Sequence, residues 1–187
     1  MGLILASQSP RRKELLGLFH IPFSVCVADV DEVMDPRLPP EQEVARVSFL
    51  KADAICRNKE DVVIAADTIV VCDGRILGKP HSADEAKQML RLLSGRTHQV
   101  MTGVTVLHGS DLQSHTEVTD VCFRTLTDPQ IEAYVATGEP MDKAGSYGIQ
   151  GGAAPFVERI SGDYYNVVGL PVCRLQQMLE KSAPELF

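Results

Sequence analysis

The stretch LILASQSPRRKELL, residues 3–16, joins a short apolar run to a helix through a polar turn. The apolar residues 3–6 predict a buried strand. Ser9 suits the N-cap of the helix, and Pro10 suits its first position, where a missing N–H costs nothing. The N–H groups of that first turn, together with the positive end of the helix dipole, form a site for an anion.

Two adjacent arginines, Arg11 and Arg12, lie in this first helical turn. Cations at this position oppose the helix dipole, so they are unfavourable unless an anion is bound there. An isolated S-P-R-R string is more often a solvated basic face than a ligand site. The strand before the turn and the helix after it favour phosphate binding.

Strand and helix patterns alternate outward from this stretch. The sequence Asp73–Gly74 is a strong hairpin signal, and Ser82 with Glu85 forms a capping box. Strands are expected at 3–6, 23–27, 61–71, 98–108, 116–126 and 156–160, and helices from Pro40 to about Arg57, at 82–95, at 127–138 and from Pro171. These patterns predict an α/β fold with a mixed sheet flanked by helices, in one domain spanning residues 1–187.

Composition limits the classes of function. The 187 residues carry a net charge of −7, which disfavours a long nucleic acid as partner because such binding needs clustered cations. The first residues show no basic leader and no apolar run long enough to span a membrane. Five scattered cysteines form no C-x-x-C pair, so neither a disulfide framework nor a zinc site is indicated. We expect a cytoplasmic protein with no membrane or nucleic-acid partner.

Several charged residues are candidates for the chemistry. Asp67 follows the apolar run VVIAA, and ligands bind at strand ends in open α/β sheets, although an isolated aspartate is more often a turn or cap residue. Lys79 and Lys143 lie in loops bounded by glycine or proline, and Lys51 lies in a predicted helix. Each lysine alone is a common surface residue. Asp31 and Glu32 are either divalent-metal ligands together with Asp67 or part of a solvated acidic loop.

Six motifs in register resemble the Maf family of nucleoside triphosphate pyrophosphatases. They are LASQSPRRKELL (5–16), AADTIV (65–70), GKP (78–80), LSGRTHQVMTGV (93–104), EPMDKAGSYGIQG (139–151) and GLPV (169–172). The resemblance implies hydrolysis of a nucleoside triphosphate to the monophosphate and pyrophosphate with a divalent metal, Mg²⁺ or Mn²⁺. It also implies a homodimer, and a fold with two lobes around a cleft that is shared with inosine-triphosphate pyrophosphatases.

The resemblance further implies which nucleotides are cleaved. Arg11, Thr68 and Gln150 match the positions that mark the subgroup acting on dTTP and UTP. Family members are also associated with septum formation and cell-division arrest, so a nucleotide-binding regulator is one alternative. A house-cleaning enzyme of the inosine-triphosphate type is another.

Cleavage at the α-phosphorus needs an activated water, a metal, and cations around the leaving pyrophosphate. We expect Asp67 to be the general base and, with Glu32, a ligand of the metal. The amide of Gln150 can pair with O4 and N3–H of uracil or thymine. The residues expected to hold the triphosphate are Ser7, Arg12, Lys51, Lys79 and Lys143.

Overall fold

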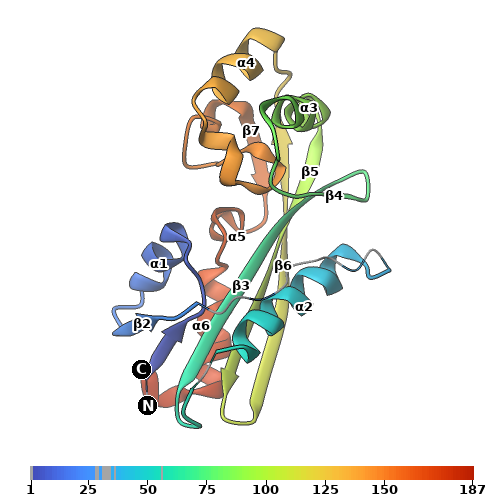
Figure 1. Cartoon of the computed structure of the whole chain (residues 1–187). Helices are drawn as coiled ribbons and strands as arrows, with labels where there is room; N and C mark the ends of the chain where they lie inside the picture. The colour runs from blue at the N-terminus through green and yellow to red at the C-terminus, as the bar shows by residue number, and fades with distance from the viewer. Residues whose placement is uncertain (1, 28–29, 31–34, 36, 56) are drawn as a thin grey trace. The chain divides into compact units, whose positions relative to one another are not determined.

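A mixed β-sheet is the frame of the computed structural model, which describes residues 2–27, 30, 35, 37–55 and 57–187. The described strands form a seven-stranded sheet in the order β2-β1-β3-β5-β6-β7, with β4 paired to β3 (Figure 1). The strands are β1 (Leu3–Leu5), β2 (Phe23–Val25), β3 (Val62–Cys72), β4 (Arg75–Leu77), β5 (Thr97–His108), β6 (Asp111–Phe123) and β7 (Val157–Ser161). The predicted α/β class with a mixed sheet is confirmed.

Six α-helices and four short 3₁₀ helices lie in the described part of the chain. None of them is both long enough and apolar enough to span a membrane. The α-helices are α1 (Pro10–Gly17), α2 (Pro40–Asp53), α3 (Ala83–Leu93), α4 (Asp128–Ala136), α5 (Tyr164–Val168) and α6 (Val172–Ser182). The 3₁₀ helices are η1 (Glu139–Asp142), η2 (Ala144–Ser146), η3 (Ala154–Phe156) and η4 (Pro184–Leu186).

The chain divides into two compact units, which correspond to the two lobes expected from the sequence. The first unit comprises residues 1–67, 102–117 and 169–187. The second comprises residues 68–101 and 118–168. Strands β3, β5 and β6 each contribute residues to both units, so the units are not consecutive segments of the chain.

The first unit is organised around the parallel strands β2, β1 and β3. Leu3 of β1 lies opposite Phe23 on one side and Val62 on the other, so β1 is the middle strand of the three. Leu3 and Leu5 are buried, as the apolar run at the start of the chain predicts. Strands that are covered on both faces need such continuous apolar runs.

The second unit contains the hairpin and the capped helices that the sequence predicts. Asp73 and Gly74 have φ values of 50° and 74°, and they connect the antiparallel strands β3 and β4. Two positive φ values in a two-residue turn match the twist of the flanking strands. At the start of α3, the side chain of Ser82 accepts a hydrogen bond from the amide of Glu85 at 3.1 Å. Helices α3 and α4 lie side by side in this unit.

Several element boundaries differ from the sequence prediction, most of all those of β6, which runs from Asp111 to Phe123 rather than over residues 116–126. Helix α2 ends at Asp53 rather than near Arg57, because the chain turns there and buries Ile55 against an apolar cluster. Strand β2 ends at Val25 rather than at residue 27. The short helix α5, Tyr164–Val168, has no counterpart in the predicted elements, since its five residues are too few to show a helical period.

Candidate active site

The first turn of α1 has the predicted cap, and the guanidinium of one of its two arginines is held by residues outside the helix. The side chain of Ser9 accepts from the amide of Arg12, and Pro10 occupies the first helical position. The guanidinium of Arg12 donates through Nε to the carbonyl oxygen of Gly169 at 2.8 Å and through Nη1 to Oγ of Ser7 at 3.3 Å. These two hydrogen bonds fix the plane of the guanidinium, as bidentate binding of a phosphate by arginine requires.

Helix α2 turns one face toward the sheet of the first unit, and that face carries a predicted site lysine. Val44, Ser48 and Lys51 are spaced four and three residues apart, so they lie on the same side of the helix. Oγ of Ser48 and Oγ1 of Thr105 are hydrogen-bonded at 2.8 Å. Nζ of Lys51 donates to Oδ1 of Asp67 at 2.6 Å. The docking of α2 therefore places the ammonium of Lys51 on the Asp67 carboxylate.

Close approach of α2 to β5 depends on a glycine. A Cβ atom added to Gly103 would lie 2.4 Å from the carbonyl oxygen of Val44 and 2.8 Å from the amide nitrogen of Ala45. Real Cβ atoms do not come this close to backbone, so the strand can carry only glycine where the helix backbone crosses it.

Asp67 lies inside β3, within the strand predicted over residues 61–71, and not at a strand end, where the ligand-binding argument from the sequence placed it. The neighbouring strand β1 stops earlier, with Leu5 opposite Ile64. Asp67 is thus beyond the carboxyl end of β1, where the chain passes into Ser7 and α1. Ligands bind at this edge in open α/β sheets. Thr68 follows Asp67 in the strand, and strand alternation directs its side chain to the opposite face.

The Lys51–Asp67 pair is shielded from solvent. The two side chains are 14% and 13% exposed. An ion pair in this environment is screened less than a surface pair, and removing either partner leaves the other charge poorly solvated. Lys51 is therefore held by the predicted base, in addition to the phosphate-binding role expected from the sequence.

Of the two expected metal ligands, only Asp67 lies among the described residues. Glu32, the other expected ligand, lies outside the described residues, as does Asp31. Within the described ranges, no three His, Cys, Asp or Glu side chains gather as a metal-binding group. Magnesium commonly takes one or two protein carboxylates and completes its shell with water and substrate phosphates. The carboxylate of Asp67 fits that requirement.

In the second unit, a backbone hydrogen bond joins the two loops that carry the other predicted lysines. The amide of Gly145 donates to the carbonyl oxygen of Gly78 at 3.0 Å. Lys79 follows Gly78 directly, and Lys143 lies two residues before Gly145. An added Cβ at Gly145, whose φ is +66°, would lie 2.8 Å from Cγ2 of Val70. The contact between the two loops therefore requires glycine at this position.

The predicted ligand-binding side chains of the second unit differ in how they are held. Nζ of Lys143 donates to the carbonyl oxygen of Glu139 at 2.8 Å and to Oδ1 of Asp142 at 2.7 Å. Lys79 and Gln150 are exposed. The Lys143 ammonium is thus fixed by its own loop, whereas the Gln150 amide is accessible from solvent.

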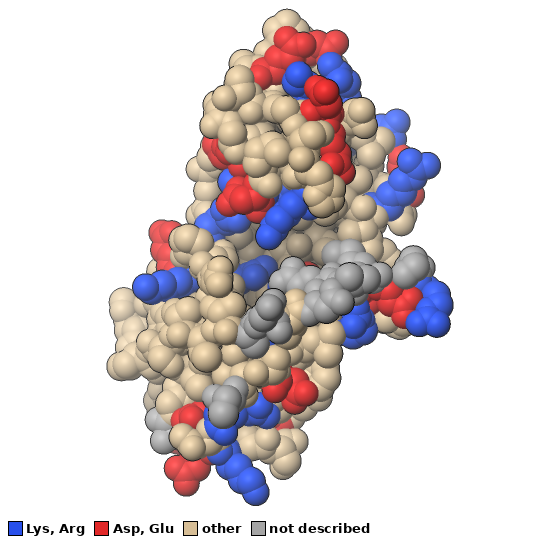
Figure 2. All heavy atoms as spheres, viewed as in Figure 1, with Lys and Arg blue, Asp and Glu red and all other residues tan. Residues whose placement is uncertain are grey.

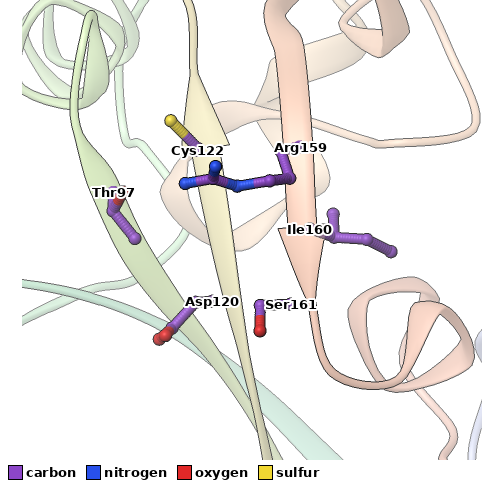
Figure 3. A pocket seen from close by; sticks show the side chains of 6 residues that line it. All are labelled: Thr97, Asp120, Cys122, Arg159, Ile160 and Ser161. Carbon is purple, nitrogen blue, oxygen red and sulfur yellow. The ribbon is translucent and has the colours of Figure 1, made fainter.

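The second unit also has a groove that none of the predicted site residues lines. Its volume is about 360 Å³, and Figure 3 shows side chains from β5, β6 and β7 around it. The side chain of Arg159 extends from β7 across β6, on the side where Cys122 is drawn. The lining residues are Thr97, Asp120, Cys122, Arg159, Ile160 and Ser161.

Charges of both signs are interspersed over the face drawn in Figure 2. The cations of this acidic chain are not gathered there into one continuous basic surface. Arg12, Lys51 and Lys143 are instead held individually by nearby oxygen atoms. Such an arrangement suits a small anion, for which a few fixed cations suffice.

Sequence reasoning missed two positions that shape the site. Gly103 interrupts a strand pattern, and an isolated glycine within such a pattern indicates close approach of another backbone, so the sequence did contain a sign of this contact. Gly169 contributes only its carbonyl oxygen to Arg12, across 157 residues of sequence. A backbone acceptor leaves no trace in residue type, so the sequence gives no signal for this contact.

Comparison with known proteins identifies similar sequences over nearly the whole chain. The family model described as Maf-like protein matches residues 2–182. A dTTP/UTP pyrophosphatase of Alkaliphilus metalliredigens is 51% identical over 184 residues, covering 96% of this chain and 95% of the relative. A dTTP/UTP pyrophosphatase of Bacillus cytotoxicus is 51% identical over 179 residues, covering 95% and 94%.

Solved structures similar to this chain share its fold at low sequence identity. The Ham1 protein of Staphylococcus aureus is 14% identical with a TM-score of 0.52, and the match covers 97% of this chain and 99% of that one. A HAM1 protein from Coxiella burnetii is 15% identical with a TM-score of 0.52 and the same coverage. At this identity the likeness shows the fold alone.

Proposed function

The chain belongs to the Maf family, and from that membership we propose that it hydrolyses dTTP and UTP to the nucleoside monophosphate and pyrophosphate. Relatives about half identical over almost all of both chains are named for this activity. The observation that carries the proposal is the shielded Lys51–Asp67 pair beyond the carboxyl end of β1, the strand that leads into the first turn of α1.

The proposed reaction is attack of water on the α-phosphorus. A bond forms between the water oxygen and the phosphorus, and the bond from that phosphorus to the bridging oxygen breaks. Asp67 takes the proton from the water, and pyrophosphate leaves with the electron pair of the broken bond. Lys51 holds Oδ1 of the carboxylate at 2.6 Å, which orients Oδ2 as the proton acceptor.

Phosphate binding is assigned to the turn between β1 and α1. The N–H groups of the first helical turn and the positive end of the dipole favour an anion there. The guanidinium of Arg12 is held beside this turn by Ser7 and the carbonyl of Gly169. Because the guanidinium is fixed before substrate arrives, little conformational entropy is lost on binding.

The proposal includes a divalent ion, Mg²⁺ or Mn²⁺, with Asp67 and Glu32 as its protein ligands. When bound, such an ion neutralises the negative charge that develops on the phosphate oxygens. We also propose a homodimer that works in the cytoplasm, as the family resemblance implies. Light scattering of the purified protein tests the dimer.

Asp67→Asn tests the assignment of the base. The amide still accepts a hydrogen bond from Lys51 but cannot take a proton, so we expect kcat for UTP to fall by about two to four orders of magnitude. Binding of UTP should persist. Asp84→Asn is the matched control, because the Asp84 carboxylate is 86% exposed and Asp84 is none of the predicted site residues. Turnover of Asp67→Asn near the wild-type rate would rule out Asp67 as the base.

Product analysis tests the reaction itself. Wild-type protein with UTP and magnesium should release pyrophosphate and UMP in equal amounts, with no orthophosphate. Profiling dTTP, UTP, CTP, GTP and inosine triphosphate separates the proposed specificity from the house-cleaning alternative. A protein that binds UTP without hydrolysing it would instead support the nucleotide-binding regulator.

A further inference from the structure

A histidine and a tyrosine form a hydrogen-bonded pair deep in the second unit. Nε2 of His98 lies 2.8 Å from the hydroxyl oxygen of Tyr147, and the two residues are 2% and 6% exposed. Both rings also meet the ring of Phe123 edge to face, with centroids 4.9 and 4.7 Å away. Burial lowers the pKa of His98 to about 4, so the imidazole is neutral at physiological pH.

Tyr147 follows an unusual turn in the loop that carries predicted ligand-binding residues. Gly145 and Ser146, which precede it, have φ values of 66° and 63°. A left-handed conformation is unfavourable for serine and persists only where the surroundings enforce it. The turn is held on one side by the hydrogen bond from Gly145 to Gly78 and on the other by the burial of Tyr147.

The pair is not the most stable choice for this place in the core. Nδ1 of His98 is buried and has no hydrogen-bond partner among the described residues. An unsatisfied buried nitrogen costs free energy, and an apolar pair of the same shape would avoid that cost. A polar pair kept at such a place is explained by what its hydrogen bond orients.

We propose that His98 is a positioning residue for nucleotide binding: its hydrogen bond with Tyr147 fixes the loop of residues 143–150 that presents Lys143 and Gln150. This role rests on the proposed pyrophosphatase function, in which Lys143 contacts phosphate and Gln150 contacts the base. The hydrogen bond fixes where the Tyr147 ring enters the core, and the ring in turn fixes the strained Gly145–Ser146 turn.

Substitutions that remove the hydrogen bond, but keep the ring packing, test this role. Tyr147→Phe should raise KM for UTP about tenfold, the usual scale for one lost hydrogen bond, with little change in kcat. His98→Gln keeps a polar group within reach of the tyrosine hydroxyl and should restore part of the affinity that His98→Phe loses. Tyr164→Phe is the matched control, because that tyrosine is 39% exposed and should tolerate the change.

The double variant His98→Phe/Tyr147→Phe separates positioning from stability. It leaves no unsatisfied polar atom in the pair, so its melting temperature should equal or exceed that of the wild type while its KM for UTP stays raised. A double variant with both the melting temperature and the KM of the wild type would overturn the proposal. A wild-type KM in Tyr147→Phe would overturn it as well.

Binding measurements distinguish failure of this role from failure of the proposed function. If wild-type protein does not hydrolyse UTP, the proposed activity is wrong. Calorimetric titration with a UTP analogue that cannot be cleaved between the α- and β-phosphates still tests His98, since the variants should then bind the analogue about tenfold more weakly. Equal affinity of wild type and Tyr147→Phe for the analogue would refute the positioning role alone.

Discussion

Replacing Gly103 by alanine should displace the helix that holds the predicted catalytic pair. The added Cβ would lie 2.4 Å from the carbonyl oxygen of Val44, and an ordinary contact needs at least 3.4 Å. The backbone of α2 must therefore move by about 1 Å at this crossing. Lys51 lies two turns further along the same helix face, 2.6 Å from Asp67, so a shift of that size breaks their hydrogen bond.

The magnitude of both effects follows from this shift. Overpacking of a close contact costs about 1–3 kcal/mol of unfolding free energy, which lowers the melting temperature of a chain of this size by roughly 3–9 °C. Displacing a catalytic group by about 1 Å lowers kcat on the order of 10². Thermal melting and pyrophosphate release from UTP measure the two effects on one preparation.

Gly17→Ala is the matched control for this substitution. An added Cβ there meets no atom within 4 Å, so the variant should keep wild-type activity and melt at or above the wild-type temperature. A Gly103→Ala protein with wild-type melting temperature and kcat would refute the claim that the close approach of α2 to β5 sets the Lys51–Asp67 geometry.

Two further predictions concern the arginines of α1 and the stability of the second unit. Arg12→Ala should weaken the binding of every triphosphate substrate alike, and Arg12→Lys should restore part of that binding, whereas Arg11→Ala should change the ranking of the substrates. Steady-state kinetics on four triphosphates test this. Equal losses of kcat/KM for both variants on all four would contradict the assignment of different roles to the two arginines. His98 has a folded pKa of about 4 against an ordinary 6.5, so its neutral form is favoured in the folded state. This difference in pKa corresponds to about 3 kcal/mol of unfolding free energy, which is fully present above pH 6.5 and is lost as the pH falls toward 4. Urea midpoints across this range should fall less steeply in His98→Gln, and parallel curves would show that His98 is not responsible.

Local sequence was sufficient wherever a structure depends on neighbours in the chain. The cap at Ser9 and Pro10, the Asp73–Gly74 hairpin and the cap at Ser82 all formed as predicted. Each depends on the conformational preference of one or two residues and on a hydrogen bond spanning at most a few positions. The alternation of these elements also determined the α/β class, because each apolar face must be buried against another element.

Element ends and site contacts depended on parts of the chain that are distant in sequence. Asp67 was predicted as a site residue, yet its place beyond the carboxyl end of β1 depends on where β1 stops, which the sequence of β3 does not contain. Likewise α2 ends at Asp53 because Ile55 joins an apolar cluster built from other segments.

The sequence by itself determined the family, the helix start with its paired arginines, and the residue types that the proposed chemistry needs. Tertiary structure alone decided which of those residues meet. Lys51 is an ordinary helix lysine until docking of α2 places it on Asp67, and Arg12 gains the carbonyl of Gly169 from the far end of the chain. These contacts are fixed by packing at Gly103 and by strand register, and packing sums contributions from segments whose proximity no local pattern encodes.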